Sequence, residues 1–138
     1  LRRSRVASIS EADAITLQQL SDAYHAWVEC GDEAPMRSVV HPIEFAVSHL
    51  PKVWVKDSAI DAICHGANLA VPGLVRADHS VRKGEKVAMM SLKGELVAVA
   101  IAKIGSKKLQ KMDTGFVADT IRVVMEPGTY PRTWKSSN

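Results

Sequence analysis

Hydrophobic residues at helical spacing predict a helix that begins after Thr16. Thr16 can cap its first turn, and Gln19 stands three residues later, as in a capping box. Gly31 is a natural stop for this helix. The hydrophobic positions share one face, so we expect an apolar stripe that packs inward while the opposite face meets solvent. These positions are Leu17, Leu20, Tyr24, Trp27 and Val28.

A second helical stretch ends at Pro51, and Pro42 inside it should kink it or divide it into two short helices. After Pro51 the period changes. Val53-Trp54-Val55 is β-branched and aromatic, which is typical of a short strand. We therefore expect the chain to have two parts, a helical part over residues 1–51 and a second part over residues 52–138.

The second part should begin with a short helix after its first strand. Asp57 and Ser58 can cap this helix, which runs through Cys64, and Gly66 supplies a left-handed stop. Two hydrophobic runs, residues 87–92 and 96–102, follow and are joined by a turn that contains glycine. This pattern predicts a hairpin.

Both strands of that hairpin are too apolar for a sheet with one face in water, so they should be covered on both sides or closed into a barrel. Alternation predicts another strand over residues 116–125, and residues 106–112 form a short amphipathic helix at best. The fold class expected is α+β, a mostly β barrel preceded by a short helical segment. The sequence contains no run of about 18 apolar residues, the length that would predict a membrane-spanning helix.

Composition and charge add a preference for a polyanion partner. The chain is 46% hydrophobic and 24% charged, which is ordinary for a folded protein. Its net charge of +3 is uneven: residues 1–51 hold 4 Lys and Arg against 7 Asp and Glu, whereas residues 52–138 hold 14 against 8. A basic module that neutralises phosphates would have this distribution, and so would a solvated surface of mixed charge.

The sequence offers no pattern for metal, nucleotide-loop or nucleophile chemistry. It contains no HExxH, GxGxxG, GxxxxGK[ST] or GxSxG spacing, so no metal site and no cofactor are expected. Asp57 and Ser58 near His65 are interpreted as helix caps rather than as part of a triad. The two cysteines, Cys30 and Cys64, are expected to be reduced and buried.

A loop bordered by glycines is the main candidate site. The segment from His65 to Gly73 joins a helix end to an apolar loop, and we expect it to expose main-chain N–H and C=O groups to the unstacked bases of single-stranded RNA. The alternative is that its glycines only permit turns and its hydrophobic residues only fill a core. The cations expected to pair with phosphates nearby are Lys56, Arg76, Arg82, Lys83 and Lys135.

Three motifs together resemble one known family. They are LPKVWVKDSA at residues 50–59, GAxLxxPG at residues 66–73 and YPRTW at residues 130–134. They closely resemble the C-terminal part of dyskerin and its archaeal counterparts, the pseudouridine synthases of box H/ACA ribonucleoproteins. Leu1 to about Ser10 is similar to the last strand of the TruB-type catalytic domain. The later part is similar to the PUA domain, a pseudo-barrel that binds RNA.

The resemblance implies that the short helix, the loop and the neighbouring strand surface hold the lower stem and the ACA trinucleotide of a guide RNA. Arg132 and Trp134 are implied as second-rank contacts, with Trp134 either stacking on a base or closing the barrel. The first-rank contacts that it implies are His65, Gly66, Ala67, Asn68, Leu69, Pro72 and Gly73.

The resemblance also bears on catalysis. Arg2 or Arg3 would fill the place of the arginine that pairs with the family's catalytic aspartate, but no part of the sequence resembles the motif of that aspartate. We therefore expect these residues alone not to form a complete enzyme. Because the sequence begins without Met, we expect a fragment of a longer protein.

The partners implied are an H/ACA guide RNA, an rRNA or tRNA substrate bound through the parent enzyme, and small H/ACA partner proteins. The implied location is nucleolar in a eukaryote and cytoplasmic in an archaeon. Two alternatives stay open: a fragment of a guide-independent tRNA pseudouridine synthase, and a barrel that serves mainly as a protein docking surface.

Overall fold

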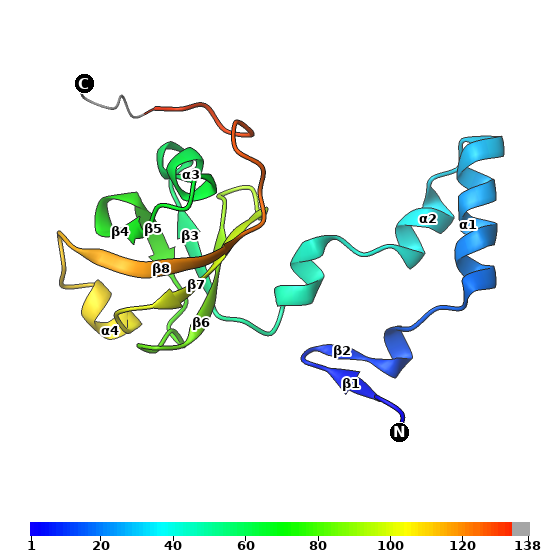
Figure 1. Cartoon of the computed structure of the whole chain (residues 1–138), viewed down its shortest axis with the longest axis horizontal. Coiled ribbons are helices and arrows are strands. Elements are labelled where there is room, and N and C mark those ends of the chain that lie inside the picture. The colour runs from blue at the N-terminus through cyan, green and yellow to red at the C-terminus, as the bar shows by residue number, and fades with distance from the viewer. Residues whose placement is uncertain (134–138) are drawn as a thin grey trace. The chain divides into compact units, whose positions relative to one another are not determined.

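The computed structural model describes residues 1–133. Contacts divide the chain into two compact units, with the division between His49 and Leu50. Helices dominate unit 1, and strands dominate unit 2 (Figure 1).

Unit 1 consists of short elements around one longer helix. The first ten residues, expected to resemble the end of a strand, instead form a hairpin of two two-residue strands that turns at Ala7, whose φ is +52°. The elements are β1 (Arg5–Val6), β2 (Ile9–Ser10), η1 (Glu11–Asp13), α1 (Leu17–Cys30), α2 (Ala34–Val39) and η2 (Ile43–Val47), the η elements being 3₁₀ helices.

The predicted ends of α1 are confirmed. The Gln19 N–H donates to Thr16 Oγ1 at 3.2 Å, and the Thr16 N–H donates to Gln19 Oε1 at 2.8 Å, which completes the capping box. Gly31 ends the helix in the left-handed region at φ +70°. Pro42 separates α2 from η2, as its position predicted.

The prediction that the apolar stripe of α1 packs inward is wrong. Leu17 is 86% exposed and Val28 is 59% exposed, and among the described hydrophobic residues of unit 1 only Ala23 is buried. The reason is one of size, because α2 packs against α1 but has 6 residues to the 14 of α1. A helix that short is less than two turns long, so it covers only part of its neighbour.

Unit 2 is built on a curved sheet in the strand order β4-β8-β7-β6-β3-β5. The neighbouring strands are antiparallel except for β3 and β6, which run parallel. The elements are β3 (Lys52–Val55), α3 (Asp57–Cys64), β4 (Leu69–Ala70), η3 (Val71–Gly73), β5 (Leu74–Ala77), β6 (Lys86–Met90), β7 (Leu96–Ala102), α4 (Ser106–Leu109) and β8 (Phe116–Val123).

The core of unit 2 lies inside this pseudo-barrel. The hairpin of β6 and β7 is confirmed. Val87 to Met90 are all buried, so β6 is covered on both faces as expected, whereas in β7 Ile101 is 39% exposed. Helix α3 contacts β7 and β8 and adds Ile60 and Ile63 to the core. The α+β prediction, a mostly β pseudo-barrel preceded by a helical segment, is confirmed.

Two local predictions in unit 2 are wrong. Lys56, rather than Asp57 or Ser58, is the residue that precedes α3, and no side chain caps the helix there. The strands β4 and β5 were also missed, because they have only two and four residues and the glycine between them indicates a turn. Among the residues that the structure describes, no helix has the length and hydrophobicity needed to cross a membrane.

Candidate nucleic-acid interface

The end of α3 directs the chain into the loop that the sequence singled out. Gly66 adopts φ +90°, its N–H donates to the Ile63 carbonyl at 2.8 Å, and the Ala67 N–H donates to the Ala62 carbonyl at 3.0 Å. This pair of bonds is a Schellman motif, which turns the chain sharply at a left-handed residue. Glycine is required here because its left-handed φ strains any residue with a Cβ atom.

The loop is then fastened to β8 by a polar pair. The Thr120 N–H donates to Asn68 Oδ1 at 2.9 Å, and Thr120 Oγ1 donates to the Ala67 carbonyl at 2.7 Å. Further on, the Val71 N–H donates to the Gly115 carbonyl at 2.9 Å. Asn68 therefore holds the loop in place through its side-chain oxygen.

These bonds correct the expected mode of recognition. The loop is exposed from His65 to Asn68 and at Pro72, so it is not sealed inside the protein. However, the amides of His65, Gly66 and Ala67 donate within α3, and the Gly73 carbonyl accepts from the Lys56 N–H at 2.8 Å. A nucleobase would therefore meet a firm surface of side chains, and these amides are not open to it.

Leu69 is a core residue rather than a contact. Its side chain is 1% exposed and belongs to the core cluster, because β4 pairs with β8 and turns this residue inward. Gly73 lies so near α3 that a Cβ atom there would stand 3.0 Å from the Ala59 Cβ and 3.3 Å from Leu69 Cδ1. The close approach of loop and helix depends on glycine at this position.

His65 and Asp61 form the polar part of this surface. The His65 side chain is 52% exposed, and its Nδ1 lies 2.8 Å from the Asp61 carbonyl oxygen and 3.7 Å from Asp61 Oδ2. Asp61 is buried, and within residues 1–133 its Oδ2 has no hydrogen-bond partner. These contacts hold the ring of His65 at the exposed end of α3.

Cys64 lies next to this pair and is buried, whereas Cys30 is exposed, so the expectation of two buried thiols holds for one of them. Burial, followed by the nearby charge of Asp61, raises the pKa of the Cys64 thiol. A thiol with a raised pKa stays protonated at neutral pH and is a poor nucleophile. Among the described residues no cluster of three or more His, Cys, Asp or Glu could hold a metal ion.

The C-terminal segment passes along the other end of α3. Thr133 Oγ1 donates to the Ser58 carbonyl at 2.9 Å, and the preceding residue, Arg132, is exposed. Trp134 and Lys135, two predicted contacts, lie outside the described residues.

The predicted cations do not all gather at the loop. Lys56 lies beside it, whereas the Arg76 guanidinium stacks on the Trp54 ring at 3.8 Å from the ring centroid. Arg82 and Lys83 lie in the turn between β5 and β6, where they line a cavity with residues of α4. Sequence reasoning missed Lys107 and Lys108 of that cavity, although their adjacency in a short amphipathic helix was a usable signal.

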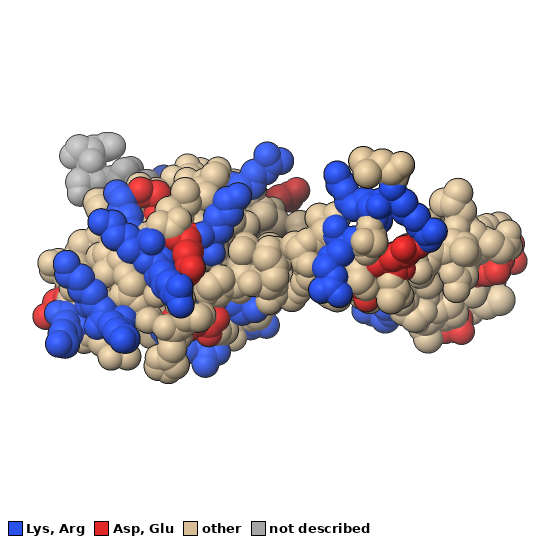
Figure 2. All heavy atoms as spheres, turned by 90° about the horizontal axis from the view of Figure 1, so that it is seen from below, with Lys and Arg blue, Asp and Glu red and all other residues tan. Residues whose placement is uncertain are grey.

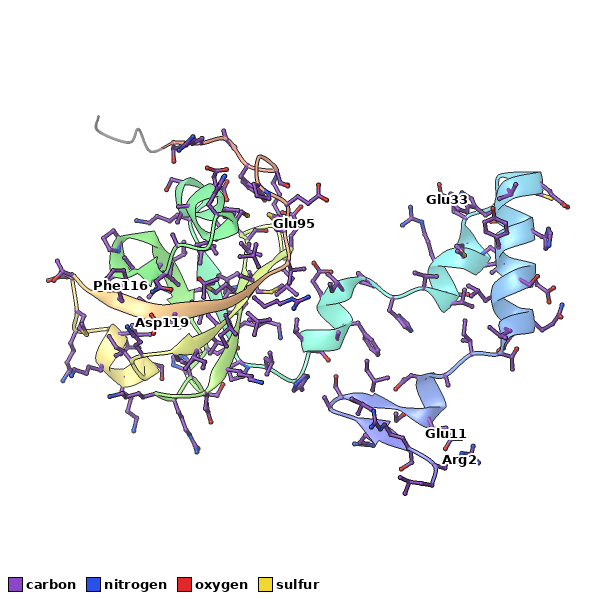
Figure 3. The ribbon with its side chains drawn as sticks, in the orientation of Figure 1. Arg2, Glu11, Glu33, Glu95, Phe116 and Asp119 are labelled. Carbon is purple, nitrogen blue, oxygen red and sulfur yellow. The ribbon has the colours of Figure 1, made fainter. Side chains whose placement is uncertain are left out.

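Basic side chains outnumber acidic ones on the face of unit 2 seen in Figure 2. In unit 1, Arg2 pairs with Glu11, and the two side chains lie close together in Figure 3. Arg3 is exposed. The expected role of either arginine beside a catalytic aspartate stays a prediction.

Two family models match the chain. Residues 51–124 match the PUA domain, and residues 1–48 match the tRNA pseudouridylate synthase B C-terminal domain. Proteins named probable tRNA pseudouridine synthase B are similar along nearly the whole chain. The one from Methanopyrus kandleri is 50% identical over 97% of this chain and 40% of its own length, and the one from Methanosarcina barkeri is 51% identical with the same coverage. The chain thus spans about two fifths of the length of these relatives.

Solved structures agree with the family models. A structure of an H/ACA ribonucleoprotein bound to a substrate RNA containing 2′-deoxyuridine is 42% identical with a TM-score of 0.88 and covers 96% of this chain and 42% of that chain. The archaeal box H/ACA Nop10–Cbf5 complex matches with 42% identity, a TM-score of 0.87 and coverage of 96% and 43%. The chain belongs to the PUA domain family, and along its length it is similar to the C-terminal region of TruB-type and dyskerin-type pseudouridine synthases.

Proposed function

We propose that unit 2 anchors the lower stem and the ACA end of an H/ACA guide RNA within a pseudouridine synthase. The exposed surface formed by α3 and the loop from Gly66 to Gly73 carries this proposal. It is supported by the 42% identity with a protein whose structure is an H/ACA ribonucleoprotein bound to RNA. A guide held in this way would base-pair with the target RNA and so place the target uridine at a catalytic domain. The uridine would then be held in position instead of having to meet the enzyme by free diffusion.

The internal bonds of the loop decide how it would hold RNA. Because the amides of Gly66 and Ala67 are already used, recognition relies on side chains and on the shape of a rigid surface. His65 at one end and Lys56 at the other would contact bases and phosphates, with Arg132 next to Thr133, which bonds to the first turn of α3. A rigid loop loses little conformational entropy when RNA binds.

A second candidate comes from the names of the curated relatives. They are probable tRNA pseudouridine synthases, so the same surface could hold tRNA without a guide. The geometry of α3 and its loop suits either RNA, because both present unpaired nucleotides beside a stem. In the first case small H/ACA partner proteins would complete the assembly, as they do in the solved Nop10–Cbf5 complex.

The test compares three RNAs on the 138-residue chain: a hairpin ending in a 3′ ACA, the same hairpin with a scrambled trinucleotide, and a tRNA transcript. At a fixed salt concentration the ACA hairpin should bind at least about tenfold more tightly than the scrambled one, the effect of one good base contact. Equal affinity for the two hairpins would contradict the proposal that the protein recognises the ACA trinucleotide. Tighter binding of tRNA would favour the second candidate.

A pair of matched variants locates the contact. His65→Ala should remove the preference for ACA, since the ring of His65 is half exposed at the end of α3. Lys86→Ala, at an exposed position at the start of β6, should leave the preference unchanged. If neither hairpin binds at all while a protein partner does, the domain is a protein docking surface instead.

A further inference from the structure

Helix α4 is tied to the turn between β5 and β6 by a buried serine. The Ser106 N–H donates to the Val81 carbonyl at 3.0 Å, and Ser106 Oγ donates to the His79 carbonyl at 2.8 Å. Ser106 is only 9% exposed. A Cβ atom on the preceding Gly105 would stand 3.5 Å from the Val81 oxygen, so the two segments are in close contact. The positions of their side chains are therefore fixed by the fold.

This contact brings four cations together. Arg82 and Lys83 from the turn and Lys107 and Lys108 from α4 line a cavity of about 500 Å³. Within residues 1–133 none of the four forms an ion pair with an acidic side chain. The nearby Glu85 carboxylate accepts the main-chain N–H of Arg82 at 3.2 Å. Four like charges held in one place repel one another, and a polyanion would relieve that repulsion.

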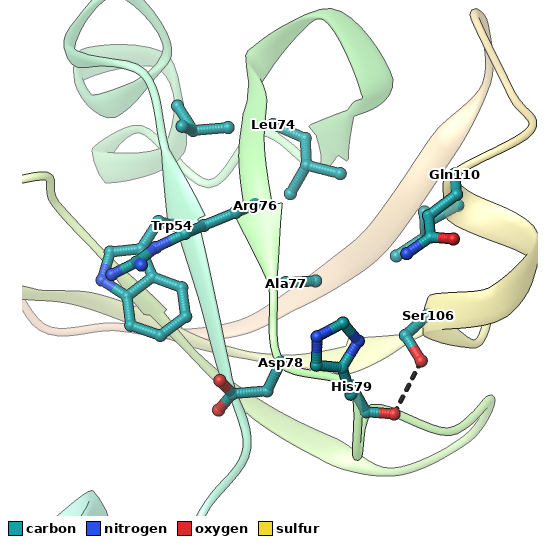
Figure 4. A pocket seen from close by; sticks show the side chains of 10 residues that line it. Trp54, Leu74, Arg76, Ala77, Asp78, His79, Ser106 and Gln110 are labelled. Carbon is teal, nitrogen blue, oxygen red and sulfur yellow. Dashed lines mark hydrogen bonds between the residues drawn. The ribbon is translucent and has the colours of Figure 1, made fainter.

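A second pocket continues from the first. It has a volume of about 470 Å³ and shares His79 and Ser106 with the cation-lined cavity. Figure 4 shows the Arg76 side chain lying across the face of the Trp54 ring, and both residues line this second pocket. Stacking on the indole holds the guanidinium flat, and flat guanidinium and aromatic groups are the surfaces on which unpaired bases stack.

We propose that these two cavities form one binding site for single-stranded RNA. This site is separate from the exposed surface formed by α3 and the loop from Gly66 to Gly73, which we call the α3 surface. We call the new site the α4 surface, made of Arg82, Lys83, Lys107 and Lys108 together with Trp54 and Arg76. The four cations bind consecutive phosphates, and one unstacked base lies against the Trp54–Arg76 pair. The proposal rests on the proposed function only in that the chain binds RNA.

The choice of RNA over an acidic protein segment follows from the pocket beside the cations. The Asp and Glu side chains of an acidic peptide would pair with the four cations, but they carry no aromatic ring to stack on the tryptophan and arginine. A pocket of about 470 Å³ is within the usual range for small-molecule sites and has room for one nucleobase. Phosphates and bases alternate along a strand, which matches two adjoining cavities of different character.

The experiment measures fluorescence anisotropy of a ten-nucleotide oligoadenylate with the full chain at several salt concentrations. Lys108→Glu should weaken binding about tenfold at low salt and reduce the slope of log affinity against log salt by about 0.7, the loss of one phosphate contact on a single strand. Arg122→Glu changes the net charge by the same amount at an exposed position of β8 that lines neither cavity, and it should have little effect. Equal losses in the two variants would overturn the site.

The base is tested separately. An abasic oligomer with the same number of phosphates should bind more weakly than oligoadenylate, and Arg76→Lys should remove that difference while keeping the charge. A polyglutamate peptide that competes as well as oligoadenylate would overturn the assignment to RNA. The preference for a 3′ ACA hairpin should survive Lys108→Glu and be lost in His65→Ala, so failure of the α4 surface and failure of the α3 surface give different results.

Discussion

Tyr130 Oη donates a hydrogen bond to Glu95 Oε2 at 2.5 Å, which fastens the C-terminal segment to the turn between β6 and β7. Ser91 Oγ donates to the same carboxylate oxygen at 2.9 Å, and Lys93 Nζ lies 5.3 Å from the Tyr130 ring centroid. Glu95 is labelled near the start of that segment in Figure 3. The segment continues from Tyr130 to the α3 surface, so this bond positions one edge of the candidate site.

The bond between Tyr130 and Glu95 predicts a pH-dependent contribution to stability. The Tyr130 hydroxyl, followed by that of Ser91, lowers the pKa of Glu95 from its ordinary value of 4.5. Stability from a carboxyl with a lowered pKa is present above its unfolded value and is lost as the pH falls through its folded value. We expect Tyr130→Phe to unfold at lower urea than the wild type at pH 7, and the difference to shrink below about pH 4.

The same bond acts in the opposite direction at high pH. Glu95 raises the pKa of Tyr130, so its contribution is complete below the ordinary value of 10.0 and is lost as the pH rises through the folded value. Tyr24→Phe is the matched control, because Tyr24 is the other tyrosine of the sequence and is half exposed. A difference between wild type and Tyr130→Phe that stays constant from pH 7 to pH 3 would show that Glu95 is not the partner.

Gly73→Ala should destabilise unit 2. The new Cβ would meet the Ala59 Cβ at 3.0 Å, and both atoms belong to backbone-linked positions that cannot swing away. Overpacking of this kind costs about 1–3 kcal/mol. Urea unfolding would measure the cost, with Gly105→Ala as a control, since Gly105 also has a negative φ and its new Cβ would meet its nearest neighbour at an ordinary 3.5 Å.

The double variant Gly73→Ala with Ala59→Gly separates the clash from other effects. Removing the Ala59 methyl should recover part of the loss, even though glycine inside α3 itself costs about 1 kcal/mol relative to alanine. Purely additive losses in the double-mutant cycle would mean that the two positions do not touch.

Elements that depend on residues close together in the sequence could be predicted, whereas features that depend on distant contacts could not. The capping box of α1 needs only Thr16 and Gln19, and the β6–β7 hairpin needs only two apolar runs and a turn, so both were predictable. The orientation of the stripe on α1 was not, because it depends on what packs against it. The attachment of the loop to β8 depends on Thr120, 52 residues beyond Asn68, and no local pattern indicates that pairing.

The charge distribution shows the same limit. Arg76 and Arg82 are six positions apart, and the sequence suggested one group of cations around the loop. The fold places Arg76 on Trp54 of the adjoining strand and Arg82 beside α4. Lys107 joins Arg82 only because Ser106 bonds to the turn, a contact across 27 residues.

Asn68→Ala should loosen the loop from β8. It leaves the Thr120 N–H without its acceptor, a loss of about 1–2 kcal/mol for a group near the surface. Asn68→Asp retains the acceptor oxygen and should stay close to the wild type when stability is measured without RNA. Hydrogen exchange of the Thr120 amide gives a direct measurement, and equal protection in Asn68→Ala and Asn68→Asp would contradict the role assigned to this oxygen.

Unit 1 should open more readily than unit 2. Among its described hydrophobic residues only Ala23 is buried, whereas most residues of β6 and β7 in unit 2 are buried. Few buried contacts mean a small free energy of local opening, so amides of α1 should exchange with solvent faster than those of β6 and β7. Thr16→Ala removes the capping box, costs about 1 kcal/mol and should speed exchange in α1 alone, because the bonds of the box join Thr16 only to Gln19 of the same helix. Faster exchange in β6 as well would show that the two units unfold together.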